Sequence, residues 1–142
     1  MSTRATYKIQ HNFGTLMTYI HHDGYPAGAA QYFFEAQVAA RVHNKSLPQV
    51  WMFANDRAEL TESHEIHGDT EYRYDLVRRG GEWRVTASKR DGYDVDTYSV
   101  FFTGTLLEFL SEHHDYVPLA QCHRSPVSNE YATLDLEGMG VS

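Results

Sequence analysis

The sequence predicts an α+β domain in which an antiparallel sheet of about five strands carries two or three helices on one face. Two observations support this fold class. Short segments of alternating hydrophobicity are joined by tight turns, which favours antiparallel neighbours. Apolar segments of helical period stand between and after these hairpins, which favours one segregated helix layer. A chain of 142 residues has the usual size of one domain, so a single domain over residues 1–142 is expected.

The first predicted element is a β-hairpin. Ala5, Tyr7 and Ile9 alternate with polar residues, which is the period of a half-buried strand. The connection "HNFG" then leads into "TLMTYIHH", and its Asn and Gly suit a tight turn.

A helix from about Pro26 to His43 follows the strand-ending segment "DGYPAG", with the proline in the first turn. One face is apolar and the opposite side carries Gln31, Glu35, Gln37 and Arg41. Phe34, Val38 and Val42 form a second apolar stripe within that polar side. Two interpretations stay open: the stripe contacts another layer of the same core, or it is a surface for a partner protein or a second copy.

The remaining elements have local start signals. Ser46 and Gln49 have capping-box spacing and predict a short helix, and Thr105 and Glu108 predict a final one. Between them, "EYRYDLVRR" and "EWRVTASKR" flank a Gly-Gly turn as a hairpin, and "DTYSVFF" predicts a further strand. The segment Tyr116–Ser142 is expected to be a loosely structured tail in which only "YATLDL" has strand character.

Composition narrows the class of protein. A formal net charge of −7, from 12 basic and 19 acidic residues, disfavours generic nucleic-acid binding and contact with anionic membranes. The single Cys122 rules out an intramolecular disulfide, which predicts a reducing compartment. There is no apolar run of membrane-spanning length and no signal-peptide core at the start, so a cytoplasmic protein is expected.

The first candidate site is "YIHHDGYP". His21 and Asp23 are good ligands for a divalent metal and point the same way on an extended strand, whereas His22 points to the other face. The favoured interpretation is structural: Asp23 accepts backbone N–H groups of the turn and the helix start, and His21 forms a hydrogen bond within the core.

The second candidate site is the loop "ESHEIHGDTE". His64 and His67 have a spacing that can converge on one metal with a carboxylate as third ligand, although a solvated acidic loop is the favoured interpretation. If both segments converge, a metal-dependent hydrolase is the enzyme hypothesis, and a divalent metal is the only cofactor considered. Its candidate catalytic residues are His21, Asp23, His67 and Asp69, and its candidate metal ligands are His21, Asp23, His64 and His67.

A third group of candidates surrounds the second hairpin. Five basic residues, Arg78, Arg79, Arg84, Lys89 and Arg90, flank its turn and strands and suit a phosphate or an acidic partner. Aromatic rings beside them are the usual stacking surface for a base, or else part of the core. The candidate ligand-binding residues are Tyr25, Tyr72, Tyr74, Arg79 and Trp83.

At "STRATY", "YIHHDGYPAGAA" and "HGDTEYRY" the chain resembles a family of small uncharacterised proteins found in bacteria and their phages. The matching positions lie between about Ser2 and Tyr74. The resemblance implies a compact α+β domain and a bacterial, prophage or phage accessory setting. It implies no activity.

The leading functional hypothesis is a non-catalytic binding module for a protein partner or a small nucleotide-like ligand, with a homodimer through Phe34, Val38 and Val42 as one form of partner. The metal-dependent hydrolase is the alternative. A weaker third hypothesis is an acidic decoy that counters a nucleic-acid-binding complex of a host, suggested by the net charge and the phage setting.

Overall fold

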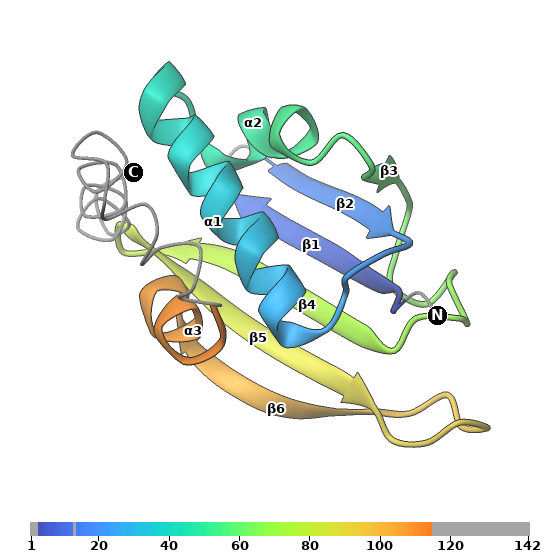
Figure 1. Ribbon diagram of the computed structural model, residues 1–142. Coiled ribbons are helices and arrows are strands. Elements are labelled where there is room, and N and C mark those ends of the chain that lie inside the picture. Colours follow the sequence, from blue (N-terminus) through green and yellow to red (C-terminus); the bar gives the residue numbers. More distant parts are fainter. Residues whose placement is uncertain (1–2, 13, 115–142) are drawn as a thin grey trace, which may run out of the picture.

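A six-stranded sheet with three helices makes up the computed structural model, which describes residues 3–12 and 14–114 (Figure 1). The strands are β1 (Ala5–His11), β2 (Gly14–Ile20), β3 (Glu59–Leu60), β4 (Tyr72–Arg79), β5 (Glu82–Arg90) and β6 (Tyr98–Thr105). The helices are α1 (Pro26–His43), α2 (Leu47–Ala54) and α3 (Leu106–His113). The predicted α+β class is confirmed, and the predicted tail Tyr116–Ser142 lies outside the described residues.

The predicted all-antiparallel sheet of about five strands needs correction, because the sheet is mixed. Its order is β3-β2-β1-β4-β5-β6, and β1 pairs with β4 in parallel, with Ala5 opposite Tyr72 and Ile9 opposite Leu76. After β2 the chain passes through α1, α2 and the two-residue β3 before β4, so the second hairpin enters the sheet alongside β1 in the same direction. The segment containing two helices thus acts as a crossover, which parallel pairing requires.

The turn and the helix starts form at the positions predicted from the sequence. Gly80 and Gly81 turn the β4–β5 hairpin with φ of 57° and 84°, values that glycine adopts without strain. Both capping boxes form, at Ser46 for α2 and at Thr105 for α3. Helix α1 has the predicted bounds and ends at Asn44 in the left-handed conformation.

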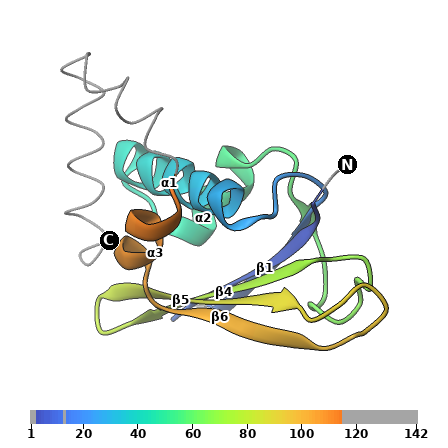
Figure 2. The same cartoon turned by 60° about the horizontal axis from the view of Figure 1, so that its bottom comes forward.

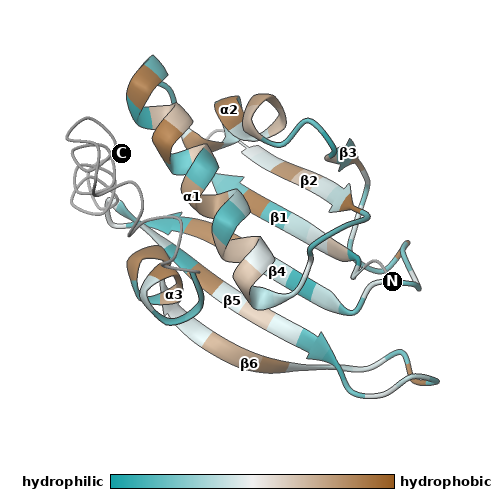
Figure 3. Ribbon diagram, in the orientation of Figure 1, coloured by the Kyte–Doolittle hydropathy of each residue, from teal (hydrophilic) through white to brown (hydrophobic). Residues whose placement is uncertain are grey.

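All three helices cover one face of the sheet, and the core lies between these two layers (Figure 2). Its centre is aromatic: the Tyr7 ring stacks on Tyr74 with centroids 5.1 Å apart and meets Phe33 edge-on at 5.8 Å. Trp51 of α2 lies 5.4 Å from Tyr7 and donates its indole N–H to Thr18. The core residues of the strands alternate with polar ones, as the banding of the strands in Figure 3 shows.

Helix α1 differs from its predicted faces in two respects. Gln37, expected on the polar side, is 1% exposed. The second stripe divides along the helix: Phe34 packs against the core and against His114 at 4.9 Å, Val38 is half-buried, and Val42 is 52% exposed. Phe34 therefore contacts the core and the residue that follows α3, and of the three residues only Val42 is more than half exposed.

In the part of the chain that the structure describes, no helix is both long and apolar enough to cross a bilayer.

Candidate functional site

Hydrogen bonds hold the chain at the corner between β2 and α1. Asp23 has a φ of 58°, and the Gly24 N–H donates to the Thr3 carbonyl at 2.9 Å. The buried Tyr74 hydroxyl donates to the Gly24 carbonyl at 2.6 Å, which fixes the corner against β4. The Asp23 carboxylate accepts from the exposed Tyr25 hydroxyl at 3.3 Å, and its charge raises the pKa of that phenol. The described partner of the Asp23 carboxylate is thus the Tyr25 hydroxyl, whereas the structural interpretation expected turn N–H groups. The His21 side chain, expected to form its hydrogen bond within the core, is 42% exposed.

His21 and the loop between β3 and β4 do approach one another, on the sheet face that the helices leave open. The Tyr19 ring lies between them: it stacks on His67 with centroids 4.0 Å apart and meets His21 edge-on at 4.5 Å. The Tyr19 hydroxyl donates to Asp69 at 2.7 Å. Burial and this carboxylate raise the pKa of the Tyr19 phenol. Three of the four predicted catalytic residues therefore gather around one tyrosine, while Asp23 contacts Tyr25 instead.

Each of these imidazoles already has a protein partner. His21 Nε2 lies 2.9 Å from a Glu59 carboxylate oxygen, and His67 Nε2 lies 2.6 Å from the Thr61 hydroxyl. Among residues 3–12 and 14–114, no three His, Cys, Asp or Glu side chains are grouped so as to hold a metal ion. The geometry of the described residues thus offers ring stacking and hydrogen bonds that hold a loop.

His64 makes a relay that the sequence analysis did not find. Its Nδ1 lies 2.5 Å from the Thr6 hydroxyl, and its Nε2 lies 3.0 Å from an Asp75 carboxylate oxygen. The order carboxylate, imidazole, hydroxyl is that of a catalytic triad. Thr6 is fully buried, however, so no substrate reaches its hydroxyl. The relay instead fixes the loop onto β1 and β4; no sequence pattern indicates it, since its three members are far apart in the chain.

The predicted ligand-binding aromatic residues do not form one surface. Tyr74 and Trp83 are 0% and 2% exposed and belong to the core, so their rings are closed to an external base. Tyr72 is half-buried and stacks beside Tyr74, and Tyr25 is 43% exposed at the corner.

The five basic residues of the hairpin also divide into two groups. Arg78, Arg79 and Arg84 lie near the Gly-Gly turn, whereas Lys89 and Arg90 end β5 at the opposite end of the sheet. The hairpin therefore has no single basic patch.

That opposite end contains a cleft of about 690 Å³. Three segments meet there: the N-terminal approach to β1, the loop before β4, and the β5–β6 loop, as the right-hand end of the sheet in Figure 1 shows. The lining residues are Arg4, Gly68, Asp69, Glu71, Lys89, Arg90, Asp91, Gly92 and Tyr93. Its size falls in the range of small-molecule sites.

The cleft is lined by as many basic as acidic side chains, and not all of them form ion pairs. Arg4 forms an ion pair with Asp69 at 3.3 Å, and Arg90 one with Asp96 at 3.6 Å while donating to the Val95 carbonyl. Lys89 is exposed, its Nζ lies 5.8 Å from the centre of the Tyr72 ring, and it has no ion-pair partner among the residues that the structure describes. The cleft thus combines one exposed ammonium group with two ion pairs.

The rim of the cleft adds an aromatic surface. Tyr93 stands in the β5–β6 loop and is 94% exposed. The loop itself is held by Arg90, by a bond from the Asp91 N–H to the Thr97 carbonyl, and by the Ser99 hydroxyl donating to Asp91. Sequence analysis predicted Asp69 and the basic residues but not Tyr93; its position in an acidic Gly-containing loop was the available signal.

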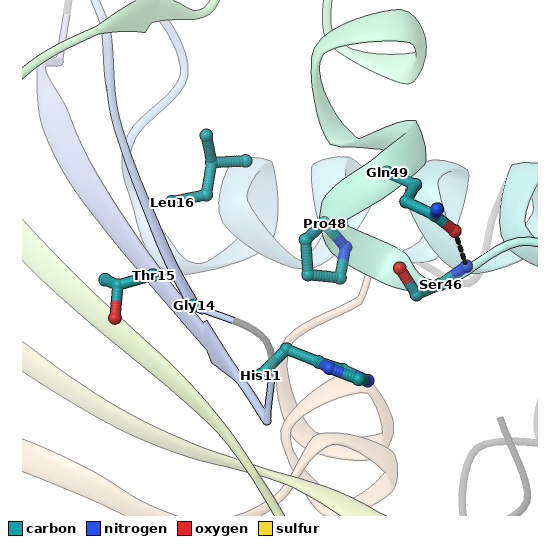
Figure 4. Close-up of a pocket in the computed structure, with 7 residues that line it drawn as sticks. All are labelled: His11, Gly14, Thr15, Leu16, Ser46, Pro48 and Gln49. Atoms are coloured by element: carbon teal, nitrogen blue, oxygen red, sulfur yellow. Dashed lines mark hydrogen bonds between the residues drawn. The ribbon is translucent and has the colours of Figure 1, made fainter.

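A second pocket, of about 470 Å³, lies between the β1–β2 hairpin and the start of α2 (Figure 4). It is lined by His11, Gly14, Thr15, Leu16, Ser46, Pro48 and Gln49. The Gln49 side chain is engaged in the capping box with the Ser46 N–H, as the dashed line in Figure 4 shows. Among the described residues, no Asp, Glu, Lys or Arg side chain lines this pocket, so those residues offer fewer groups for specific recognition than the lining of the larger cleft.

Comparisons of the chain with protein-family models, with curated proteins and with solved structures gave no match.

Proposed function

We propose that this protein is a non-catalytic binding module whose ligand is a small nucleotide-like molecule held in the cleft between Arg4, Lys89 and Tyr93. The observation that carries the proposal is the combination of an exposed ammonium group, an exposed aromatic ring and ligand-sized space in one cleft. The accessory setting implied by the family resemblance and a protein partner at Val42 stay predictions.

The carboxylates of the cleft narrow the ligand class. A bare anion is repelled by Asp69, Glu71 and Asp91, which line the same space. A nucleotide offers each group a partner: phosphate for Lys89, sugar hydroxyls or exocyclic amines for the carboxylates, and a base to stack on Tyr93. Stacking tolerates different bases, so the phosphate and the ring are the features we expect to be required.

Thermal-shift and calorimetric titrations with adenosine and guanosine monophosphates test this proposal, with adenosine and inorganic phosphate as partial ligands. A ligand that binds only the native state raises the melting temperature, and we expect both nucleotides to exceed either partial ligand. Lys89→Ala and Tyr93→Ala should each weaken binding, the latter by about 1 to 3 kcal/mol through lost stacking. Arg79→Ala is the matched control, because it removes a cation from the far end of the same hairpin. Failure of every nucleotide to bind, or equal loss with Arg79→Ala, contradicts the proposal.

The metal-dependent hydrolase remains the alternative, and the approach of His21, His67 and Asp69 to Tyr19 is what favours it. It requires that Zn²⁺ or Mn²⁺ raise the melting temperature, that a chelator reverse the rise, and that His67→Ala abolish it. The nucleotide proposal requires none of these three results. The same titration, run with metals, therefore separates the two functions.

A further inference from the structure

The two edges of the sheet are built differently. One edge is β3, which has only two residues, one of them the charged Glu59. Short length and charge are the usual protection of an edge against another chain. The other edge is β6, which has eight residues, YSVFFTGT, without a charge or a proline. Among the described elements, β6 pairs only with β5 and has no strand on its outer side.

Exposed apolar side chains lie on both faces of β6. Val100 is 59% exposed and pairs with Ser88 on the face without helices. Phe101 is 41% exposed and turns to the helix side, where its ring lies 5.9 Å from that of Tyr72 and 6.1 Å from that of His113. Two adjacent residues thus place exposed apolar side chains on opposite faces of the sheet at this edge. An occupant that approaches edge-on covers both, whereas a ligand on either face covers only one.

A β-bulge interrupts the pairing of β5 with β6. The pairing shifts between Ala87 and Ser88, so that Phe101 is the extra residue in β6. Bulges that twist the strand away and charged side chains are both common protections of a sheet edge. Here the bulged residue is a phenylalanine, which leaves the edge apolar where protection would favour a charge.

We propose that the β6 edge is a twofold interface between two copies of this chain, with Val100 and Phe101 at its centre. The strand is uncharged, so antiparallel alignment of β6 with its own copy brings no like charges opposite each other. An isologous contact of this kind closes on itself and leaves no edge for further addition. This inference is independent of the proposed ligand cleft and of the predicted Phe34, Val38 and Val42 surface.

Sedimentation velocity and light scattering of the full chain, from about 1 µM to about 1 mM, test the interface. We expect a concentration-dependent monomer–dimer equilibrium. Val100→Lys places two ammonium groups near the twofold axis and should raise the dimer dissociation constant at least about tenfold. Leu60→Lys and Phe53→Lys are matched controls, because both residues are 71% exposed and lie away from β6, and they should leave the constant unchanged.

Hydrogen exchange of the unaltered chain gives a second readout that does not depend on any variant folding. The β6 amides should exchange slowly at high protein concentration and faster on dilution, while β3 amides should not change. A monomer at all concentrations overturns the proposal. So does a dimer that resists Val100→Lys or is equally weakened by Phe53→Lys. Protection of β6 that is independent of concentration also overturns it, because the edge is then covered within one chain.

Discussion

Gly24 and Gly28 occupy positions where a β-carbon has no room. A β-carbon on Gly28 would lie 2.0 Å from the Asp23 carbonyl oxygen, and one on Gly24 would lie 2.6 Å from the Ala5 β-carbon. The tight turn "HHDGYPAG" therefore requires glycine for steric reasons at two positions. The structural interpretation of this segment is favoured over a chemical one on that ground.

Gly28→Ala should destabilise the protein by about 1 to 3 kcal/mol in urea denaturation, because the added methyl forces the corner apart. The sign of this change in stability is informative, because replacing glycine by alanine inside a helix ordinarily stabilises a protein by up to about 1 kcal/mol. Gly68→Ala is the control: nothing lies within 4 Å of its β-carbon position, and a change within about 0.5 kcal/mol is expected. A stabilised Gly28→Ala variant would show that the corner relaxes freely.

Element boundaries followed from residues that act within a few positions of one another. Pro26 starts α1, the Gly80–Gly81 pair turns a hairpin, and the Thr105–Glu108 box starts α3, each as the sequence predicts. Burial was less predictable. Gln37 was assigned to solvent from helical period alone, but contacts from other elements decide which side of a helix is covered.

The α3 capping box gives a pH prediction with a defined sign. The Thr105 N–H donates to the Glu108 carboxylate at 2.8 Å, and this bond lowers the pKa of the Glu108 carboxyl. A lowered folded-state pKa means that the carboxylate stabilises the fold above the ordinary Glu pKa and loses this effect as pH falls through the folded-state value. Near neutral pH, wild type should be more stable than Glu108→Gln, and the difference should vanish at about pH 3.

Urea midpoints of both proteins across that pH range measure the effect. Ser46→Ala serves as the comparison, because the capping box that it disrupts in α2 uses Gln49, which does not titrate; it should cost about 1 kcal/mol at every pH. A difference between wild type and Glu108→Gln that is constant with pH would contradict the assignment to the carboxylate charge.

At the scale of the whole molecule, the sequence was least informative wherever distant segments meet. The parallel pairing of β1 with β4 joins segments more than sixty positions apart, with Ala5 opposite Tyr72, and alternation within each strand is the same for either direction. The cleft likewise forms where distant segments meet: Arg4 precedes β1, Asp69 lies in the loop before β4, and Tyr93 lies in the β5–β6 loop. Of these three residues the sequence analysis predicts only Asp69, and their convergence depends on topology that no local pattern encodes.

The loop between β3 and β4 lies across this parallel junction on the face without helices. His64 contacts Thr6 on β1 and Asp75 on β4, and its side chain is only 11% exposed. The His64 imidazole therefore links the two predicted hairpins on this face, in addition to the backbone pairing of β1 with β4. Loss of this imidazole leaves the buried Thr6 hydroxyl without that partner and removes one of the contacts that hold the loop on the sheet.

His64→Ala should therefore lower the free energy of unfolding by about 1 to 3 kcal/mol, the range for removing one partner of a buried polar group. The loss should appear in the global urea transition, because the contact spans the β1–β4 junction on which the whole sheet depends. His43→Ala is the matched control, since His43 is exposed at the end of α1 and contacts the Phe53 ring; it should stay within about 0.5 kcal/mol. Hydrogen exchange identifies the outcome that contradicts this prediction. Faster exchange confined to residues 61–70, with an unchanged global transition, would mean that the loop opens locally and that the helices and the β1–β4 pairing hold the two hairpins together without it.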